Sequence, residues 1–275
     1  MTFLRMGAEV LVPNSCVYPG ARLRVRSPAR LPEGNYIAAL GGAATFGKGV
    51  ARAWPQLLEG ATGCAVANLG AVGAGPEAYE RDAALLAICA SARAVVVEVP
   101  GAEALCNPFY RVHSRRNDRV IEVLAPLTAL YPELDLHEPG FARGLLARLR
   151  SCDAARFAEV ASALQAAWSL RMGALVQRIS ASAPVTLLWL GDRPPPDGTV
   201  PPTERSAPAL VTGAMLARLV SQGGRVVLAV AEGPQRAAAF GLPSQATHEA
   251  AATALARSLA TAGSTGAPPD RRAAG

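Results

Sequence analysis

The sequence is poor in lysine, in aromatic residues and in long apolar runs. Lys48 is the only lysine among 275 residues, and the aromatic residues together make up 5%. The formal charge of +6 therefore comes almost wholly from arginine, and no RNP-like, zinc-finger or helix-turn-helix pattern accompanies it. No apolar run approaches the roughly 18 residues that a membrane-spanning helix needs. We expect neither a nucleic-acid partner nor a membrane partner.

The cysteines form no recognisable metal or disulfide pattern. There are five of them, an odd number without CxxC spacing, and several lie in apolar runs where a small buried side chain is expected. The N-terminal segment MTFLRMGAEVLV carries acid and arginine and lacks a small-residue cleavage site. These features favour a reducing, cytoplasmic location and a protein that uses no metal and no cofactor.

Five short apolar runs alternate with helical patterns along the chain. The runs occupy residues 36–40, 64–70, 94–99, 185–191 and 225–231. Helical patterns follow at 50–58, 81–92, 119–130, 141–149, 154–179, 209–221 and 245–260, with Ser151 or Asp153 as the cap of the longest. This alternation predicts an α/β fold with a doubly wound five-stranded parallel sheet in a three-layer sandwich. We expect an extended arm at 1–34, a single α/β domain at 35–262 and a disordered tail at 263–275.

The most informative segment is the glycine-rich turn in YIAALGGAATFGK, residues 36–48. An apolar strand runs directly into Gly41, Gly42 and Gly47, and a helix is expected to begin within the turn. The N–H groups at a helix N-terminus have no partner within the helix, and the helix dipole is positive there. The sequence therefore predicts an anion or a developing oxyanion at this turn.

One interpretation of the turn is a P-loop. Gly42, Gly47 and Lys48 fit GxxxxGK, but Gly49 stands where a P-loop places the hydroxyl that binds magnesium. A sulfotransferase-like variant needs no magnesium ion, and Asp192 could serve as a Walker B residue. This interpretation predicts a transferase that depends on a nucleotide or a sulfonucleotide.

The other interpretation is a resemblance to SGNH (GDSL-type) hydrolases over residues 35–260. GGAATFG at 41–47 is similar to the first block, GDSxTxG, with Ala43 in the place of the serine nucleophile. NLGAVGAG at 68–75 resembles the second block, which implies that Gly73 donates an oxyanion-hole N–H. GAEA at 101–104 resembles the GxND block with Glu103 for asparagine, and Gln245 and His248 take the place of the DxxH pair. The resemblance implies an SGNH-like sandwich that lacks its nucleophile.

A closer likeness is to an uncharacterised alphaproteobacterial protein family. That family carries a GG-x-E-T-aromatic-G turn and an FY-x-VH-x-RRNDR segment, which residues 41–47 and 109–119 resemble. Arg111, His113, Arg115, Arg116 and Arg119 place five potential cations close together in this second segment. Arginine forks bind phosphate, sulfate or carboxylate, so the segment predicts an anion site. An arginine network paired with acids is the alternative.

These observations predict binding of an anionic small molecule, or of an acyl or glycan substituent, at the carboxyl ends of the strands. The cleft would contain Gly42, Ala43, Gly73, Lys48 and the cations of the 111–119 segment. His248 or Glu103 could activate a water molecule if any catalysis survives, and Thr45 is expected to bond the local backbone. A P-loop-like transferase and a non-enzymatic interaction protein stay open as alternatives.

Overall fold

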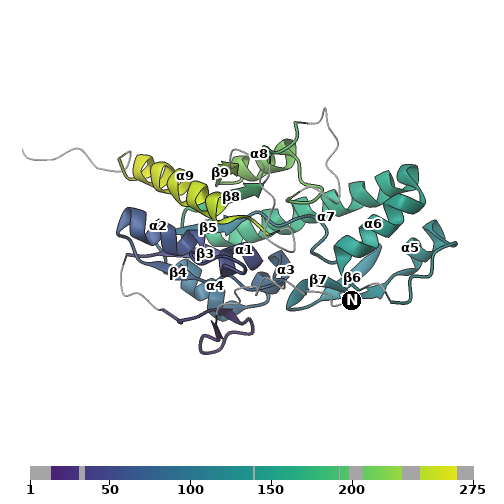
Figure 1. The fold of residues 1–275 in the computed structure, drawn as a ribbon, viewed down its shortest axis with the longest axis horizontal. Coiled ribbons are helices and arrows are strands. Elements are labelled where there is room, and N and C mark those ends of the chain that lie inside the picture. Colours follow the sequence, from purple (N-terminus) through teal and green to yellow (C-terminus); the bar gives the residue numbers. More distant parts are fainter. Residues whose placement is uncertain are drawn as a thin grey trace, which may run out of the picture.

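The computed structural model describes residues 14–30, 35–138, 140–191, 193–197, 207–230 and 242–264. A five-stranded parallel sheet lies at its centre, in the order β4-β3-β5-β8-β9 (Figure 1). The strands are β3 (Ile37–Leu40), β4 (Val66–Asn68), β5 (Ala94–Glu98), β8 (Val185–Gly191) and β9 (Gly224–Val230). Each coincides with a predicted strand, and the order reverses direction after β4, as in doubly wound folds. The predicted fold class is confirmed.

Helices cover both faces of this sheet and make it the middle of three layers. On one face, α2 (Trp54–Thr62) and α9 (Gln245–Ser264) pack against the sheet. On the other face lie α4 (Ala83–Ala90), α7 (Ala154–Ser180) and α8 (Gly213–Ser221). None of the helices in the described ranges is both long and apolar enough to cross a bilayer.

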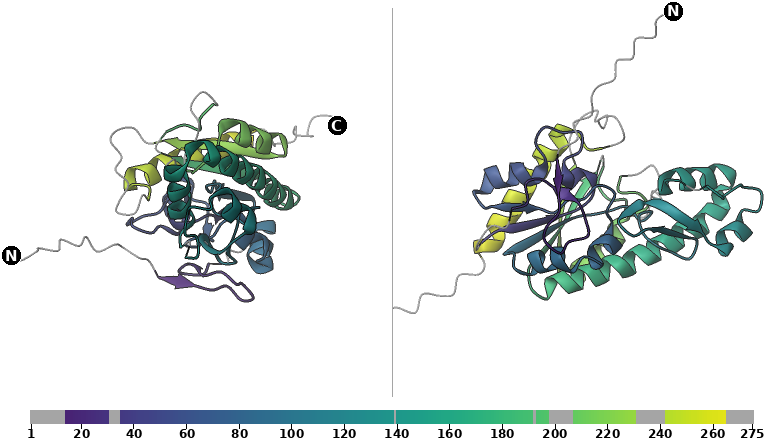
Figure 2. Two further views of the ribbon diagram at one scale, coloured as in Figure 1. Left: turned by 90° about the vertical axis from the view of Figure 1, so that its right-hand side faces the viewer. Right: turned by 90° about the horizontal axis from the view of Figure 1, so that it is seen from below.

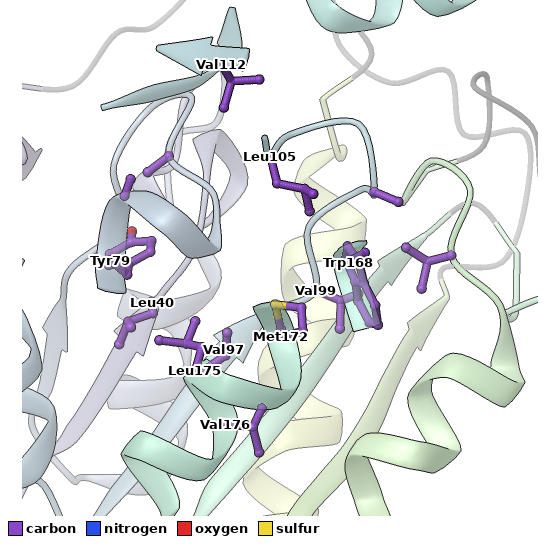
Figure 3. Packing of buried hydrophobic residues seen from close by; sticks show 14 of the residues in the cluster. Leu40, Tyr79, Val97, Val99, Leu105, Val112, Trp168, Met172, Leu175 and Val176 are labelled. Atoms are coloured by element: carbon purple, nitrogen blue, oxygen red, sulfur yellow. The ribbon is translucent and has the colours of Figure 1, made fainter. Parts of the chain in front are cut away.

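The strands are almost wholly apolar because both faces are covered. Along β8, Leu187 and Trp189 point into the larger core under α7, whereas Leu188 and Leu190 point into the smaller core under α2 and α9. Figure 3 shows the larger core, in which Val97 and Val99 lie opposite Met172 and Leu175 of α7. Every residue of β8 is buried, which is the pattern of a central parallel strand.

Several helix boundaries differ from the prediction. The 50–58 helix begins at Trp54, because Pro55 is tolerated only in the first turn. The 81–92 helix is α4 (Ala83–Ala90), capped by Asp82, and a short helix that was not predicted, α3 (Pro76–Glu80), precedes it. Asp153 is the cap of α7, accepting from the N–H groups of Ala155 at 2.8 Å and Arg156 at 2.9 Å, so one of the two predicted caps is confirmed. Of the predicted tail, residues 265–275 lie outside the described residues.

The predicted helix at 119–130 is wrong in its first half. Residues Arg116–Val123 form strand β7, which pairs antiparallel with β6 (Tyr110–His113), and only Ala125–Leu130 is helical, as α5. The physical reason is the alternation in RVIEV, where Val120 is buried and Ile121 is 61% exposed. This β6–β7 hairpin, α5 and α6 (Ala142–Cys152) lie together at one end of the molecule (Figure 1).

One buried carboxylate is a main anchor of the N-terminal arm on the domain, beside the buried side chains of Leu23 and Val25. Residues 14–30 contain a short ladder between β1 (Ser15–Cys16) and β2 (Val25–Arg26), drawn in purple in Figure 2. Asp82 Oδ2 accepts from the N–H groups of Arg22 at 2.7 Å and Leu23 at 2.9 Å, and its Oδ1 accepts from Leu85 N–H at 3.2 Å. The same side chain therefore holds the arm and caps α4. Residues 1–13 and 31–34 of the predicted arm lie outside the described ranges.

We expect Asp82→Ala to lower the free energy of unfolding by about 3 kcal/mol, because three N–H groups lose a charged acceptor. Urea unfolding measures this loss, and limited proteolysis should show faster cleavage within residues 14–30. Asp135→Ala is the control, since Asp135 is exposed and accepts one N–H, from His137. An arm that stays as resistant in Asp82→Ala as in the wild type would contradict the anchoring role.

Candidate functional site

A cleft of about 620 Å³ opens at the carboxyl ends of β3, β5 and β8. Its walls come from the loops that follow these strands, from the β6–β7 hairpin, from Arg143 of α6 and from the start of α9. Ligands of doubly wound sheets bind at this edge. Six of the predicted site positions line the cleft: Gly42, Ala43, Lys48, Gly73, Glu103 and Arg116.

The anion expected at the glycine-rich turn is supplied by the protein itself. Oε2 of Glu98, the last residue of β5, accepts from Gly42 N–H at 3.0 Å and Thr45 N–H at 2.9 Å, and from the Thr45 hydroxyl. These N–H groups belong to the start of α1 (Ala43–Phe46). The turn therefore binds an internal carboxyl group. Thr45 was expected to bond the local backbone, and its hydroxyl bonds Glu98 instead.

Glu98 is the functional residue that our sequence analysis missed. Burial raises the pKa of its carboxyl, and this effect outweighs the opposing effect of the hydrogen bonds from Thr45 and Gly42. Glu98 lines the cleft, and its Oε1 has no hydrogen-bond partner in the described part of the chain. The available signal was that Glu98 is the only charged residue in the run AVVVEV.

His248 is buried next to Trp54 and does not line the cleft. Its Nδ1 accepts from Trp54 N–H at 3.1 Å, while the indole Nε1–H of Trp54 donates to Thr45 Oγ1 at 3.2 Å. A neutral imidazole that accepts at Nδ1 carries its proton on Nε2, and a base that takes a proton at Nε2 needs the other tautomer. Burial also lowers the pKa of His248 to about 4. The catalytic role of His248 stays a prediction that this geometry disfavours.

Glu103 is part of the cleft wall, where it pairs with an arginine. Its Oε1 accepts from Arg143 Nε at 2.8 Å, and the side chain is almost fully buried. Its Oε2 is buried without a hydrogen-bond partner among the residues described. A buried carboxylate oxygen without a donor is energetically costly.

Arg116 and Asp118 form a second ion pair in the cleft, directly against Gly73. Arg116 donates from Nε to Asp118 Oδ1 at 3.2 Å and from Nη2 to Oδ2 at 3.1 Å. A Cβ at Gly73 would clash with both side chains, and Gly73 has a φ of +77°, so glycine is required here. Its N–H donates to no acceptor among the described residues, and its role as an oxyanion donor stays a prediction.

The cations of the 111–119 segment do not form one site. Arg111 and Arg119 lie outside the cleft: Arg111 is exposed opposite Glu122, and Arg119 stacks on Phe141 at 4.5 Å. On β7, Arg119 is an odd number of residues from Arg116 and points to the other face, whereas Arg111 pairs with Glu122 at the far end of the hairpin from Arg116. Asn117, between these arginines, caps α3: its Oδ1 accepts from Gly75 N–H at 2.9 Å and from Ala78 N–H at 3.3 Å.

The turn does not have the geometry of a P-loop. A P-loop runs strand, loop and then a helix that starts at the GK pair. Here α1 ends in front of Lys48, at Gly47, which is left-handed, and the next helix begins only at Trp54. Asp192, offered as a Walker B residue, lies outside the described residues. Within those residues, no cluster of three or more His, Cys, Asp and Glu side chains could hold a metal ion.

Residues 1–263 match the family model described as "Domain of unknown function (DUF6473)". The chain belongs to this family. A search of curated proteins gave no match.

Three solved structures are similar to this DUF6473 chain at low identity. A carbohydrate esterase family 2 enzyme with a carbohydrate binding domain, from Corynascus thermopiles (Myceliophthora fergusii), aligns with 17% identity and a TM-score of 0.47 over 88% of this chain and 69% of that one. Phospholipase A1 from Streptomyces albidoflavus NA297 aligns with 12% identity and a TM-score of 0.44 over 82% and 98%. The lipase Lip_vut3 from a goat rumen metagenome aligns with 14% identity and a TM-score of 0.41 over 81% and 96%. No chemistry is carried from these proteins to this chain at such scores.

We expect the burial of neutral His248 to make stability depend on pH. Because the pKa is about 4 in the folded state and about 6.5 in the unfolded state, the unfolded chain binds more protons between these values. The free energy of unfolding should therefore fall as the pH drops through this window, by on the order of 3 kcal/mol in total. In His248→Asn, which keeps an acceptor for Trp54 N–H but does not titrate, this part of the fall should disappear.

Urea unfolding at several pH values measures the effect. His137→Asn is the matched control, because His137 is exposed. If the free energy of unfolding depends on pH in the same way in the wild type and in His248→Asn, the interpretation of His248 as buried and neutral is wrong.

Proposed function

We propose that this chain binds an anionic small molecule, or the acyl or glycan substituent of a larger one, in the cleft, and that it does so without a serine nucleophile. The observation that most directly supports the absence of a serine nucleophile is the first residue of α1. The methyl group of Ala43 lines the cleft there, as does the carboxyl group of Glu98. A methyl group cannot attack an acyl carbon, so covalent catalysis at this position is closed. The cleft is large enough for a small ligand.

Cations in the cleft walls favour an anionic ligand. Lys48, Arg116 and Arg143 line the cleft from three separate segments. Arg116 uses Nε and Nη2 for Asp118, and its Nη1 has no hydrogen-bond partner in the described ranges. A guanidinium group has five N–H donors, so Arg116 can hold a ligand oxyanion and Asp118 together.

Thermal unfolding against a panel of sulfate, phosphate, short acyl compounds, sulfonucleotides and nucleoside triphosphates tests the proposal, because a ligand of the native state raises the midpoint. We expect stabilisation by an oxyanion or an acyl compound. Ala43→Phe, which places a bulky side chain at the centre of the cleft, should weaken or abolish it, and Arg116→Ala should weaken it by about tenfold in Kd. Arg111→Ala is the matched control from the same hairpin.

Two outcomes would favour the alternatives. Stabilisation by a nucleotide that is lost in Lys48→Ala would favour a nucleotide-dependent transferase. Absence of any ligand effect, with Ala43→Phe indistinguishable from the wild type, would favour an interaction protein.

Glu98 supports a second candidate function, hydrolysis without serine. A carboxylate with a raised pKa is a suitable general base near neutral pH, and Oε1 is the oxygen without a hydrogen-bond partner in the described residues. In this reaction Oε1 takes a proton from water, and the water oxygen bonds the acyl carbon of an ester. The tetrahedral intermediate then expels the alcohol oxygen, which takes the proton back from Glu98. Acid and alcohol are released, and Glu98 is regenerated.

If Glu98 acts in this way, Glu98→Gln should lower hydrolysis of p-nitrophenyl acetate by about 100-fold or more. Its stability should remain, because the glutamine oxygen can still accept from Gly42 and Thr45. The wild-type rate should rise with pH through the raised pKa, as the carboxyl loses its proton. Glu122→Gln, an exposed change, is the control. Equal rates in wild type and Glu98→Gln would exclude Glu98 as the base.

A further inference from the structure

A second cavity of about 510 Å³ lies beside the cleft and is strongly basic. Residues of the N-terminal arm, the glycine-rich turn and the β6–β7 hairpin meet there. No aspartate or glutamate of the described residues lines it. The side chains that carry or can carry positive charge are Arg22, Arg24, Lys48, His113, Arg115 and Arg116. We call this cavity the basic pocket.

Three of the arginines, Arg22, Arg24 and Arg115, have no carboxylate partner among the described residues. Arg22 and Arg115 are exposed, and the structure records no carboxylate partner for either side chain within the described ranges. Arg24 bonds Ser15 Oγ at 3.1 Å, which is a neutral partner. Arg116 pairs with Asp118, and Asp118 lines the cleft rather than this pocket. Like charges gathered in this way repel one another, and a bound anion relieves the repulsion.

The basic pocket has an apolar floor. Its histidine, His113, is held in one orientation by two backbone N–H groups. Leu23, Phe46, Ala71 and Val72 line the cavity beneath the cations. Nδ1 of His113 accepts from the N–H groups of Arg115 and Arg116, both at 3.2 Å. The proton of the neutral ring is therefore on Nε2, which makes His113 a hydrogen-bond donor there.

We propose that the basic pocket binds the phosphoryl group of a small phosphate or pyrophosphate ester, with the organic part of the ligand on the apolar floor. Guanidinium forks match the oxygens of a phosphate in pairs, and four of the six side chains are arginine. A carboxylate carries one negative charge. A phosphate or pyrophosphate carries more than one, so it can bind several cations at once, and the cations of the basic pocket come from three segments of the chain.

The basic pocket and the cleft share walls. Lys48, Val72 and Arg116 line both cavities. A phosphorylated ligand that is long enough can therefore hold its phosphoryl group in the basic pocket and extend its remaining part into the cleft. This extension rests on the proposed function, whereas phosphoryl binding in the basic pocket does not.

Isothermal titration of the full chain with pyrophosphate and with inorganic phosphate at low salt tests the proposal. We expect pyrophosphate to bind more tightly than phosphate, and Arg22→Ala combined with Arg115→Ala to weaken pyrophosphate binding by about tenfold or more. Arg111→Ala, an exposed arginine on the same hairpin but outside the pocket, should leave the Kd unchanged. Ala43→Phe should also leave it unchanged, which separates this pocket from the cleft.

Three results would overturn the proposal. The first is no pyrophosphate binding by the wild type. The second is an equal loss in Arg111→Ala, which would mean general attraction to surface charge. The third is tighter binding of a short single-stranded oligonucleotide that depends on the same two arginines, which would assign the surface to nucleic acid.

Discussion

The burial of the Glu98 carboxyl against the glycine-rich turn is the interaction on which the rest of the site depends. Two N–H groups and one hydroxyl of the turn converge on Oε2. A Cβ at Gly41 would collide with Glu98 and with Thr45, so the packing itself demands glycine at that position. The end of β5 is thereby joined to the start of α1, and the shape of the cleft floor follows from this contact.

Further hydrogen bonds link the Glu98–Thr45 contact to helices α2 and α9. Thr45 accepts from the indole of Trp54, and the backbone N–H of Trp54 donates to His248. Glu98, Thr45, Trp54 and His248 therefore connect β5, α1, α2 and α9. His248 contributes to the scaffold in this chain of hydrogen bonds: its Nδ1 accepts from Trp54, and burial lowers its pKa, so it is a weak proton acceptor.

Two adjoining cavities with different electrostatics define the functional face. In the cleft, Glu103 and Asp118 are paired with arginines, and the charges are nearly balanced. In the basic pocket, the cations are concentrated without lining acids from the described chain. Arg116 belongs to both, and its position depends on Gly73, whose missing side chain makes room for the Arg116–Asp118 pair. Under the proposed function this face recognises an anion, and Ala43 offers no nucleophile for acyl transfer.

The sequence by itself determined the five strands, their parallel class and the edge at which a site forms, because apolar runs between helical patterns require a sheet covered on both faces. It also placed Gly42, Ala43, Gly73, Glu103 and Lys48 in the cleft, since these residues lie in the loops that follow the strands. Only the tertiary structure decided which charges meet. Arg119 stacks on Phe141 and Arg111 lies opposite Glu122, both outside the cleft; the arm brings Arg22 and Arg24 to Arg115, and Glu98 occupies the turn. These contacts join residues distant in the sequence, and local periodicity carries no information about such pairs.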